Sequence, residues 1–359
     1  MQIKLTESRL PFAPLLLIAP FFFWGTAMVA MKGVIPNTTP LFMAGVRLLP
    51  AGILVVITGI IMGRPQPQGW KAWLWISLFA LIDGAMFQCF LAQGLVRTGA
   101  GLGSVMIDSQ PLAVALLSWW LFGEKIGLWG CLGLAIGVVG ISLIGIPDDL
   151  ILGFFQSGNI QAGVDLQHLF ANGEWLMLMA ALSMALGTVI VRGVCRYADP
   201  VTSTGWHLIL GGLPLFVFSA ATESQQWVNI DLSNWVALGY ATVFGSAVAY
   251  GLFFYFASSG NLTSLSSLTF LTPVFALFFG NLFLSETLSK LQSIGVCLTL
   301  VSIYLINQRD VLTEKLSWWR PRVTVVGDAE TSSLLPSSTQ DILEISLEVR
   351  LPESESDML

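Results

Sequence analysis

The chain has 359 residues, of which 55% are apolar and 11% are charged, and its net charge is −6. Soluble domains carry about 25% charged residues, so this composition excludes a water-soluble globular protein and predicts a polytopic membrane protein. The acidic balance and the lack of a basic stripe exclude nucleic acid as a partner, and the lipid bilayer is the expected environment.

Ten apolar runs follow one another along the chain, each close to the length of about 20 residues that a membrane-spanning helix needs. They lie at 11–31, 38–62, 71–96, 101–122, 126–146, 173–195, 201–220, 232–257, 263–284 and 289–307. Lysine and arginine gather before the first run, between the second and third runs and after the last run. The positive-inside rule therefore predicts that both termini are cytoplasmic. It places the loop 147–172 outside and leaves 308–359 as a cytoplasmic, largely disordered tail.

The fourth apolar run returns as the ninth. Pro111 pairs with Pro273 and Glu124 with Glu286 at one offset, because 273 − 111 and 286 − 124 both equal 162. A proline inside a spanning helix frees a backbone carbonyl and predicts a kink. Transporters built from repeats place interrupted helices of this kind beside their substrate site.

The duplication extends over five runs in each half. Gly25-Thr26 recurs as Gly187-Thr188, and Arg47 lies at the position that His207 occupies in the second half. Because five is odd, the second copy must enter the membrane from the opposite side. The predicted fold is an all-α integral membrane protein, with ten transmembrane helices arranged as two inverted five-helix repeats over 11–146 and 173–307.

Several stretches resemble a known family. The segments MALGTVIVRGV, DPVTSTGWHLILGGLPL and LTSLSSLTFLTPVFALFFGNLFLSETL resemble the EamA branch of the drug/metabolite transporter superfamily, and they are most similar to its cyanobacterial and plant-plastid members. The resemblance covers roughly residues 11–307. It implies a central cavity lined mainly by helices 1, 3, 4, 6, 8 and 9. It also implies a location in the bacterial plasma membrane, with the plastid envelope as the alternative.

Four ionisable side chains lie deep in the apolar runs: Arg47, Asp83, Asp108 and His207. A charge at the bilayer centre costs about 2.5–3.5 kcal/mol on insertion scales, so each needs a partner or a wet cavity. Arg47 and Asp108 lie about 14 Å and about 10 Å inward along their helices, which predicts an ion pair, either a static clamp or a gating or proton-linked element. For His207, a neutral hydrogen-bonded histidine and a coupling role both stay open.

The candidate substrate-binding residues are the polar and aromatic side chains of the central helices. They are Trp24, Asp83, Gln88, Asp108, Thr188, Trp206, His207 and Tyr250, and the structural or gating candidates are Arg47, Pro111, Pro273, Glu124 and Glu286. Taken singly, each of these residues also fits ordinary packing. Glu124 and Glu286 fit interfacial anchors or caps on loop amides.

The sequence motifs do not support an enzymatic function. There is no GxxxxGK[ST] phosphate loop, no HExxH and only two histidines, so no cofactor or metal is predicted. The sequence favours a secondary transporter that moves a small organic metabolite, amino-acid-like or otherwise amphipathic, by alternating access as an exporter or exchanger. The alternative is a membrane-embedded structural or regulatory subunit. In a carrier the polar residues should converge on one water-accessible cavity, and in a structural subunit they should pair off in dry helix contacts.

The oligomeric state is left open between a monomer and a homodimer. Four glycines, Gly130, Gly133, Gly137 and Gly140, lie on one face of the fifth predicted helix. Such a ladder lets another backbone approach closely. It fits either packing within the chain or a dimer seam.

Overall fold

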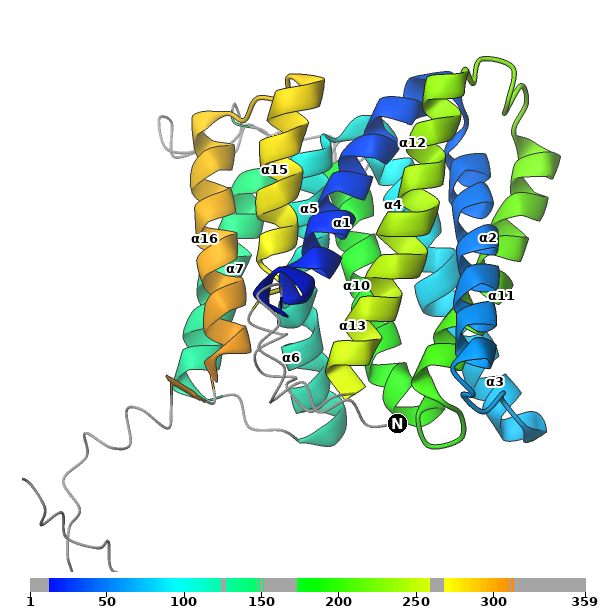
Figure 1. The fold of residues 1–359 in the computed structure, drawn as a ribbon. Coiled ribbons are helices and arrows are strands. Elements are labelled where there is room, and N and C mark those ends of the chain that lie inside the picture. Colours follow the sequence, from blue (N-terminus) through cyan, green and yellow to red (C-terminus); the bar gives the residue numbers. More distant parts are fainter. Residues whose placement is uncertain are drawn as a thin grey trace, which may run out of the picture. The chain divides into compact units, whose positions relative to one another are not determined.

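The computed structural model describes residues 13–123, 127–146, 173–258 and 268–309, together with positions 148, 151, 311 and 312. These residues form helices joined by short turns, and no strand occurs among them (Figure 1). Nine helical stretches are long and apolar enough to cross a membrane, and the shorter apolar helix Leu271–Leu284 stands at the place of the ninth predicted run. The predicted all-α membrane fold is confirmed.

The helices follow the predicted runs closely. The first half contains α1 Ala13–Val34, the short η1 Ile35–Asn37, α2 Pro40–Ile61, α3 Gly69–Phe79, η2 Ala80–Met86, α4 Phe87–Arg97, α5 Ala100–Asp108, α6 Gln110–Phe122 and α7 Leu128–Gly145. The second half contains α10 Gly173–Val194, α11 Pro200–Thr222, α12 Leu232–Thr242, η3 Val243–Val248, α13 Ala249–Ser258, α15 Leu271–Leu284 and α16 Lys290–Asn307. Glu124, the loop expected at 147–172 and the tail expected at 308–359 lie outside the described residues, apart from single positions.

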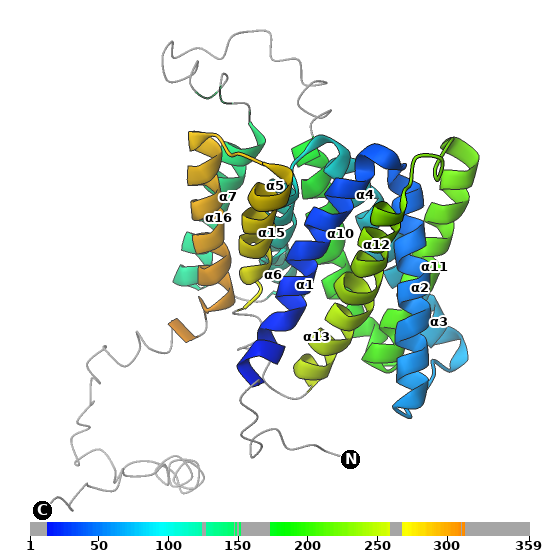
Figure 2. The same cartoon turned by 45° about the horizontal axis from the view of Figure 1, so that its top comes forward.

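Packing between the halves follows a two-fold pattern. The second helices of the halves, α2 and α11, pack on each other, and so do the fifth helices, α7 and α16. The first helix α1 packs on α15, the ninth span, just as α10 packs on the fourth span α5–α6. Figure 2 shows that α1 begins and α16 ends at the same end of the bundle, as an even number of crossings requires.

Glycines set the closest helix contacts. A Cβ on Gly52 would lie 2.7 Å from the carbonyl oxygen of Gly205, so α2 and α11 meet backbone to backbone. In the glycine ladder of α7, a Cβ on Gly140 would lie 2.9 Å from the carbonyl oxygen of Gly295 on α16. Within the described residues, the ladder therefore serves packing inside the chain.

The third span is interrupted in both halves, and the fourth span is interrupted in the first half. The third span of each half carries a π-helical segment, η2 and η3, and the segments start 163 residues apart (243 − 80) and end 162 apart (248 − 86). The fourth span of the first half breaks at Ser109, just before Pro111. In the second half α15 begins at Leu271, so Pro273 lies in its first turn. π-Helical segments are rare and occur mostly at functional sites.

Candidate functional site

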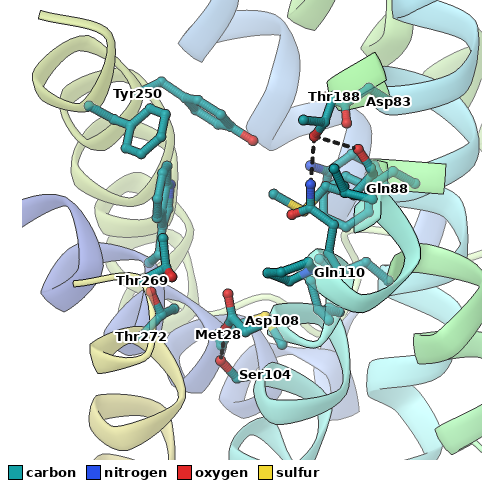
Figure 3. A pocket seen from close by; sticks show the side chains of 18 of the residues that line it. Met28, Asp83, Gln88, Ser104, Asp108, Gln110, Thr188, Tyr250, Thr269 and Thr272 are labelled. Atoms are coloured by element: carbon teal, nitrogen blue, oxygen red, sulfur yellow. Dashed lines mark hydrogen bonds between the residues drawn. The ribbon is translucent and has the colours of Figure 1, made fainter. Parts of the chain in front are cut away.

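One cavity of about 520 Å³ lies at the centre of the bundle. Of the residues predicted to bind substrate, Trp24, Asp83, Gln88, Asp108, Thr188, His207 and Tyr250 line it, and so do Arg47 and Pro111. Figure 3 shows Tyr250, Thr269 and Thr272 on one wall and Gln88, Gln110 and Thr188 facing them. Both halves thus contribute polar side chains to a single space.

Of the predicted site residues that the structure describes, Trp206, Pro273 and Glu286 do not line this cavity. Trp206 donates its indole N–H to Oε1 of Gln66 at 3.0 Å and packs against Trp73. It neighbours His207 on α11, and one residue turns a helix by about 100°, so the two side chains point in different directions. Pro273 is buried in α15, while its neighbour Thr272 reaches the cavity.

Asp83 and His207 form the ionisable pair of the site. Nε2 of His207 lies 3.3 Å from Oδ2 of Asp83. Nδ1 of His207 lies 2.7 Å from the carbonyl oxygen of Thr204, which can only accept, so Nδ1 carries a hydrogen. A neutral imidazole of this tautomer would turn a lone pair toward a carboxylate. A hydrogen bond between these two atoms would need a hydrogen on Nε2 of His207 or on Oδ2 of Asp83.

Close packing fixes the position of this pair. A Cβ on Gly187 of α10 would lie 2.6 Å from Oδ1 of Asp83, so only glycine leaves room for the carboxylate there. On the other side, the ring of Phe79 lies 4.3 Å from the imidazole ring of His207, centroid to centroid. His207 is only 1% exposed. The pair is thus held between α10 and α11 at the π-helical segment η2.

The predicted ion pair between Arg47 and Asp108 is wrong. Arg47 donates from Nη1 to Oγ of Ser246 at 3.0 Å and from Nη2 to Oε1 of Gln88. Asp108 instead accepts a hydrogen bond from Ser104 at 3.0 Å, one turn earlier on its own helix. Similar depth in the membrane does not decide which way a side chain points around its helix, and here the two point to different partners.

The arginine and the histidine occupy equivalent places. We call Arg47, Asp83, Gln88, His207, Ser246 and Tyr250 the central polar cluster. His207 lies 160 positions after Arg47 (207 − 47), Tyr250 lies 162 after Gln88 (250 − 88), and Ser246 lies 163 after Asp83 (246 − 83). Each second helix therefore reaches the π-helical segment of the opposite half, Arg47 at Ser246 and His207 at Asp83.

An aromatic wall adjoins the central polar cluster. The ring centroid of Trp24 lies 5.4 Å from that of Tyr250 and 5.3 Å from that of Phe253. Across the cavity Gln110 donates to the hydroxyl of Thr188 at 2.5 Å, as the dashed line in Figure 3 marks. The cavity can therefore take up a ligand with both an apolar body and a polar end.

Sequence reasoning missed several lining or supporting residues, among them Met28, Ser104, Gln110, Ser246, Phe253, Thr269 and Thr272. A usable signal existed for two of them. Ser246 lies within one residue of the repeat equivalent of Asp83, and Gln110 is the equivalent of Thr272 (272 − 110 = 162). Comparing the halves position by position would have found both.

The cavity extends toward one end of the bundle. Its lining includes Asn307 and Arg309, at and beyond the end of α16, and Val191, near the end of α10. At the opposite end, Glu286 accepts hydrogen bonds from the amides of Ala100 and Gly101 at 2.6 and 3.0 Å, which caps α5. A helix N-terminus favours such a carboxylate.

Two further contacts tie the helices together at this opposite end. Nζ of Lys32 on α1 donates to the carbonyl of Leu95 at 2.7 Å, close to the end of α4. Glu223, which follows α11, accepts from the amides of Leu41 and Phe42 at 3.0 and 3.1 Å and so caps α2. Together with Glu286 they join the helices where the cavity does not reach.

The residues that the structure describes contain no group of three or more histidine, cysteine, aspartate or glutamate side chains that could hold a metal ion. The cavity lining offers two permanent cations, Arg47 and Arg309, together with two carboxyl groups, one imidazole and several hydroxyl and amide groups, beside aromatic rings.

Comparisons with known proteins agree with the repeat. Residues 11–146 and 171–308 each match the EamA-like transporter family. An uncharacterized transporter of Synechocystis is 60% identical over 334 residues, which cover 91% of this chain and 100% of the relative. A chloroplastic WAT1-related protein of Arabidopsis thaliana is 52% identical over 295 residues, which cover 81% of this chain and 68% of the relative.

A solved crystal structure supports the fold at low sequence identity. It superposes with a TM-score of 0.58 at 16% identity, and the match covers 84% of this chain and 97% of the other. At this identity the likeness concerns the arrangement of the helices alone.

Proposed function

Since the chain belongs to the EamA-like transporter family and is a membrane transporter, we propose that it is a secondary carrier without enzymatic activity. It moves a small organic metabolite, amino-acid-like or otherwise amphipathic, by alternating access, as an exporter or exchanger. The observation that carries this proposal is the convergence of polar and aromatic side chains from both halves on one cavity of about 520 Å³. Ligand sites of about 300–1,000 Å³ are usual for small molecules.

Orientation and location form part of the proposal. Both termini face the cytoplasm, and the membrane is the bacterial plasma membrane, with the plastid envelope as the alternative. The cavity then reaches toward the cytoplasmic end, at Asn307 and Arg309, and the contacts of Lys32, Glu223 and Glu286 close the outer end. A reporter at position 160 should be accessible from outside; cytoplasmic exposure of that reporter contradicts the orientation.

Proton coupling is a further part of the proposed function. A hydrogen bond between Asp83 and His207, whose Oδ2 and Nε2 lie 3.3 Å apart, would hold one proton beside the cavity, and histidine is the side chain whose ordinary pKa lies closest to neutral pH. The other ionisable side chains among the described residues that line the same cavity are Arg47, Asp108, Tyr250 and Arg309. Loss of the proton removes the attraction between Asp83 and His207, and we expect this to change the packing of α11 on η2.

The test is uptake and counterflow in vesicles that contain the purified protein. Metabolites of each charge class are offered, with and without an imposed pH gradient. Single cysteines are placed at position 97, the outer end of the third span, and at position 122, the inner end of the fourth span. Their accessibility to a thiol reagent should change in opposite senses when substrate is added. Vesicles that take up nothing above protein-free controls, with accessibility unchanged by every class, favour a structural subunit instead.

A further inference from the structure

Arg47 is a permanent cation inside the membrane-spanning part of the bundle. Its side chain is 5% exposed and lines the central cavity. A guanidinium keeps its charge in practically any protein environment, and a buried charge needs a compensating partner. The identity of that partner therefore says what the cavity accepts.

The protein gives Arg47 neutral partners. Nη1 and Nη2 donate to the hydroxyl of Ser246 and the amide oxygen of Gln88, and Nε has no hydrogen-bond partner among the described residues. The two carboxyl groups of the cavity are engaged elsewhere, Asp83 with His207 and Asp108 with Ser104. Arg47 thus faces the cavity with no salt bridge to any carboxyl group that the structure describes, and the other arginine of the lining, Arg309, lies beyond the end of α16.

Gln88 and Ser246 fix the orientation of the guanidinium. One lies on α4 of the first half and the other on η3 of the second half, so the fork of Arg47 is held from both repeats. Each Nη carries two hydrogens and donates one of them in these bonds, and a planar guanidinium binds a carboxylate through two parallel N–H groups. The positioned fork is thus ready for a second acceptor.

Tyr250 connects this charge to the aromatic wall. It lines the same cavity as Arg47, and its ring packs edge-on against Trp24, whose ring also contacts Phe253. An apolar body that lies along these rings would bring an acidic end group to Arg47. Asp83 and Asp108 near the same space disfavour a second negative charge on the ligand.

We propose, on the basis of the carrier function above, that the cavity selects monovalent organic carboxylates. The carboxylate is held by Arg47, which Gln88 and Ser246 position, and the apolar or aromatic body lies against Trp24, Tyr250 and Phe253. Free organic acids and zwitterionic amino acids share this carboxylate. Asp108, which lies across the cavity from Tyr250 (Figure 3), accepts from Ser104 through Oδ2 and can offer Oδ1 to an ammonium group in the second case.

The test needs no variant at first. Wild-type protein in lipid nanodiscs is titrated at neutral pH with hydrocinnamate, its amide hydrocinnamide, phenylpropylamine, phenylpropylphosphonate and phenylalanine. These probes share a phenyl body and differ in charge. We expect hydrocinnamate to bind at least about tenfold more tightly than the amide, a difference that one charge-assisted pair supplies. The amine and the phosphonate should bind no better than the amide. Phenylalanine distinguishes the two sources of the carboxylate. Tighter binding of phenylalanine than of hydrocinnamate indicates zwitterionic amino acids, and weaker binding indicates free organic acids.

Matched variants then assign the effect to Arg47. Gln88→Glu offers the guanidinium an internal carboxylate of nearly the same shape, so the preference for acid over amide should disappear while the fold is kept. Arg47→Gln should do the same by removing the charge. Arg196→Gln removes an equal charge from an exposed position outside the cavity and should leave the preference unchanged.

Each outcome decides the inference. Equal binding of acid and amide, or a preference that Gln88→Glu leaves intact, overturns it. Transport of uncharged or cationic probes alone also overturns it and leaves the carrier function standing. If probes of every charge class are neither bound nor transported, the carrier function fails, and this inference fails with it.

Discussion

The first half of the chain presents Arg47 to the third span of the second half, and the second half presents His207 to the third span of the first. The backbones agree closely, down to a π-helical segment in each third span. The chemistry differs, because one contact joins the guanidinium of Arg47 to the neutral hydroxyl of Ser246 and the other joins the imidazole of His207 to the carboxyl group of Asp83. Under the functions proposed above, the duplicated fold keeps its geometry for alternating access and separates two tasks, carboxylate binding at Arg47 and proton binding at His207.

The largest expected effect follows from breaking the ionisable contact. Asp83→Ala leaves His207 buried without its partner, and removal of one member of a buried ionic pair costs about 3–5 kcal/mol. We expect a large fall in thermal stability and a loss of uptake. The double variant Asp83→Asn/His207→Gln restores a neutral hydrogen bond and should recover stability, but its transport should no longer respond to a pH gradient.

The equivalent contact of the first half, between Arg47 and Ser246, should contribute less to stability. Ser246→Ala removes one acceptor from Arg47 and leaves Gln88 in place, at a cost of about 1.5–3 kcal/mol for a hydrogen bond to a charged group. Comparison of the two melting temperatures tests the asymmetry. A loss in Ser246→Ala as large as that in Asp83→Ala would show that the two contacts are energetically alike, contrary to the division of tasks above.

A second comparison uses the repeated Gly-Thr pairs. A Cβ on Gly25 would lie 2.6 Å from the backbone oxygen of Thr272, and a Cβ on Gly187 would lie 2.6 Å from the side-chain Oδ1 of Asp83. Overpacking costs about 1–3 kcal/mol. Gly25→Ala must push α1 from α15 and should lose more stability. Gly187→Ala displaces the carboxylate of Asp83 and should lose more transport. The opposite ranking in the two assays contradicts the proposed role of Asp83.

A further comparison concerns the end of the bundle where the cavity does not reach. Glu286→Ala removes the acceptor for the amides of Ala100 and Gly101, and loss of a helix cap costs about 0.5–2 kcal/mol. We expect faster labelling of a single cysteine at position 97. Glu223→Ala, which uncaps α2, is the matched variant. Unchanged labelling in both indicates that these caps stabilise their helices without holding the end closed.

Residue pattern and repeat spacing predicted most of this molecule. The apolar runs, the odd number of helices in each repeat and the paired prolines lead directly to the inverted fold, because lipid requires every spanning backbone to satisfy its own hydrogen bonds. Seven of the eight proposed substrate residues line the one cavity, although their roles stay predictions. Polar side chains in a spanning helix turn away from lipid and toward the inside of the bundle. For this reason the polar residues within the apolar runs could be assigned to the cavity from the sequence.

The partners of these residues could not be predicted. Arg47 and Asp108 match in depth, but rotation about each helix axis sends one toward Ser246 and the other toward Ser104. The π-helical segments have no sequence signature like that of a proline, and an extra residue in a turn rotates everything after it. Trp206 shows the same limit, because its neighbour His207 reaches the cavity while its own indole binds Gln66.

The smallest expected effect concerns the start of the third span in each half. In the second half, Asp231 caps α12 by accepting from the amide of Asn234 at 2.8 Å. Its equivalent in the first half, Gln68 (231 − 68 = 163), makes no side-chain cap on α3. The backbone hydrogen bond from Asn234, followed by the bond from Ser233, lowers the pKa of the exposed Asp231 carboxyl.

A lowered pKa in the folded state means that the ionised form of Asp231 stabilises the fold above the usual pKa of aspartate. This contribution fades as the pH falls through the lowered value. Asp231→Asn keeps a capping oxygen that does not titrate, so wild type should be the more stable of the two at neutral pH, by at most about 2–4 °C in Tm. The difference in Tm between wild type and Asp231→Asn should disappear as the pH falls below about 4. Gln68→Asp should give the first half the same pH-dependent gain. A gap that is constant from neutral to acidic pH would show that the charge on Asp231 contributes nothing and that the two helix starts differ only in hydrogen bonding.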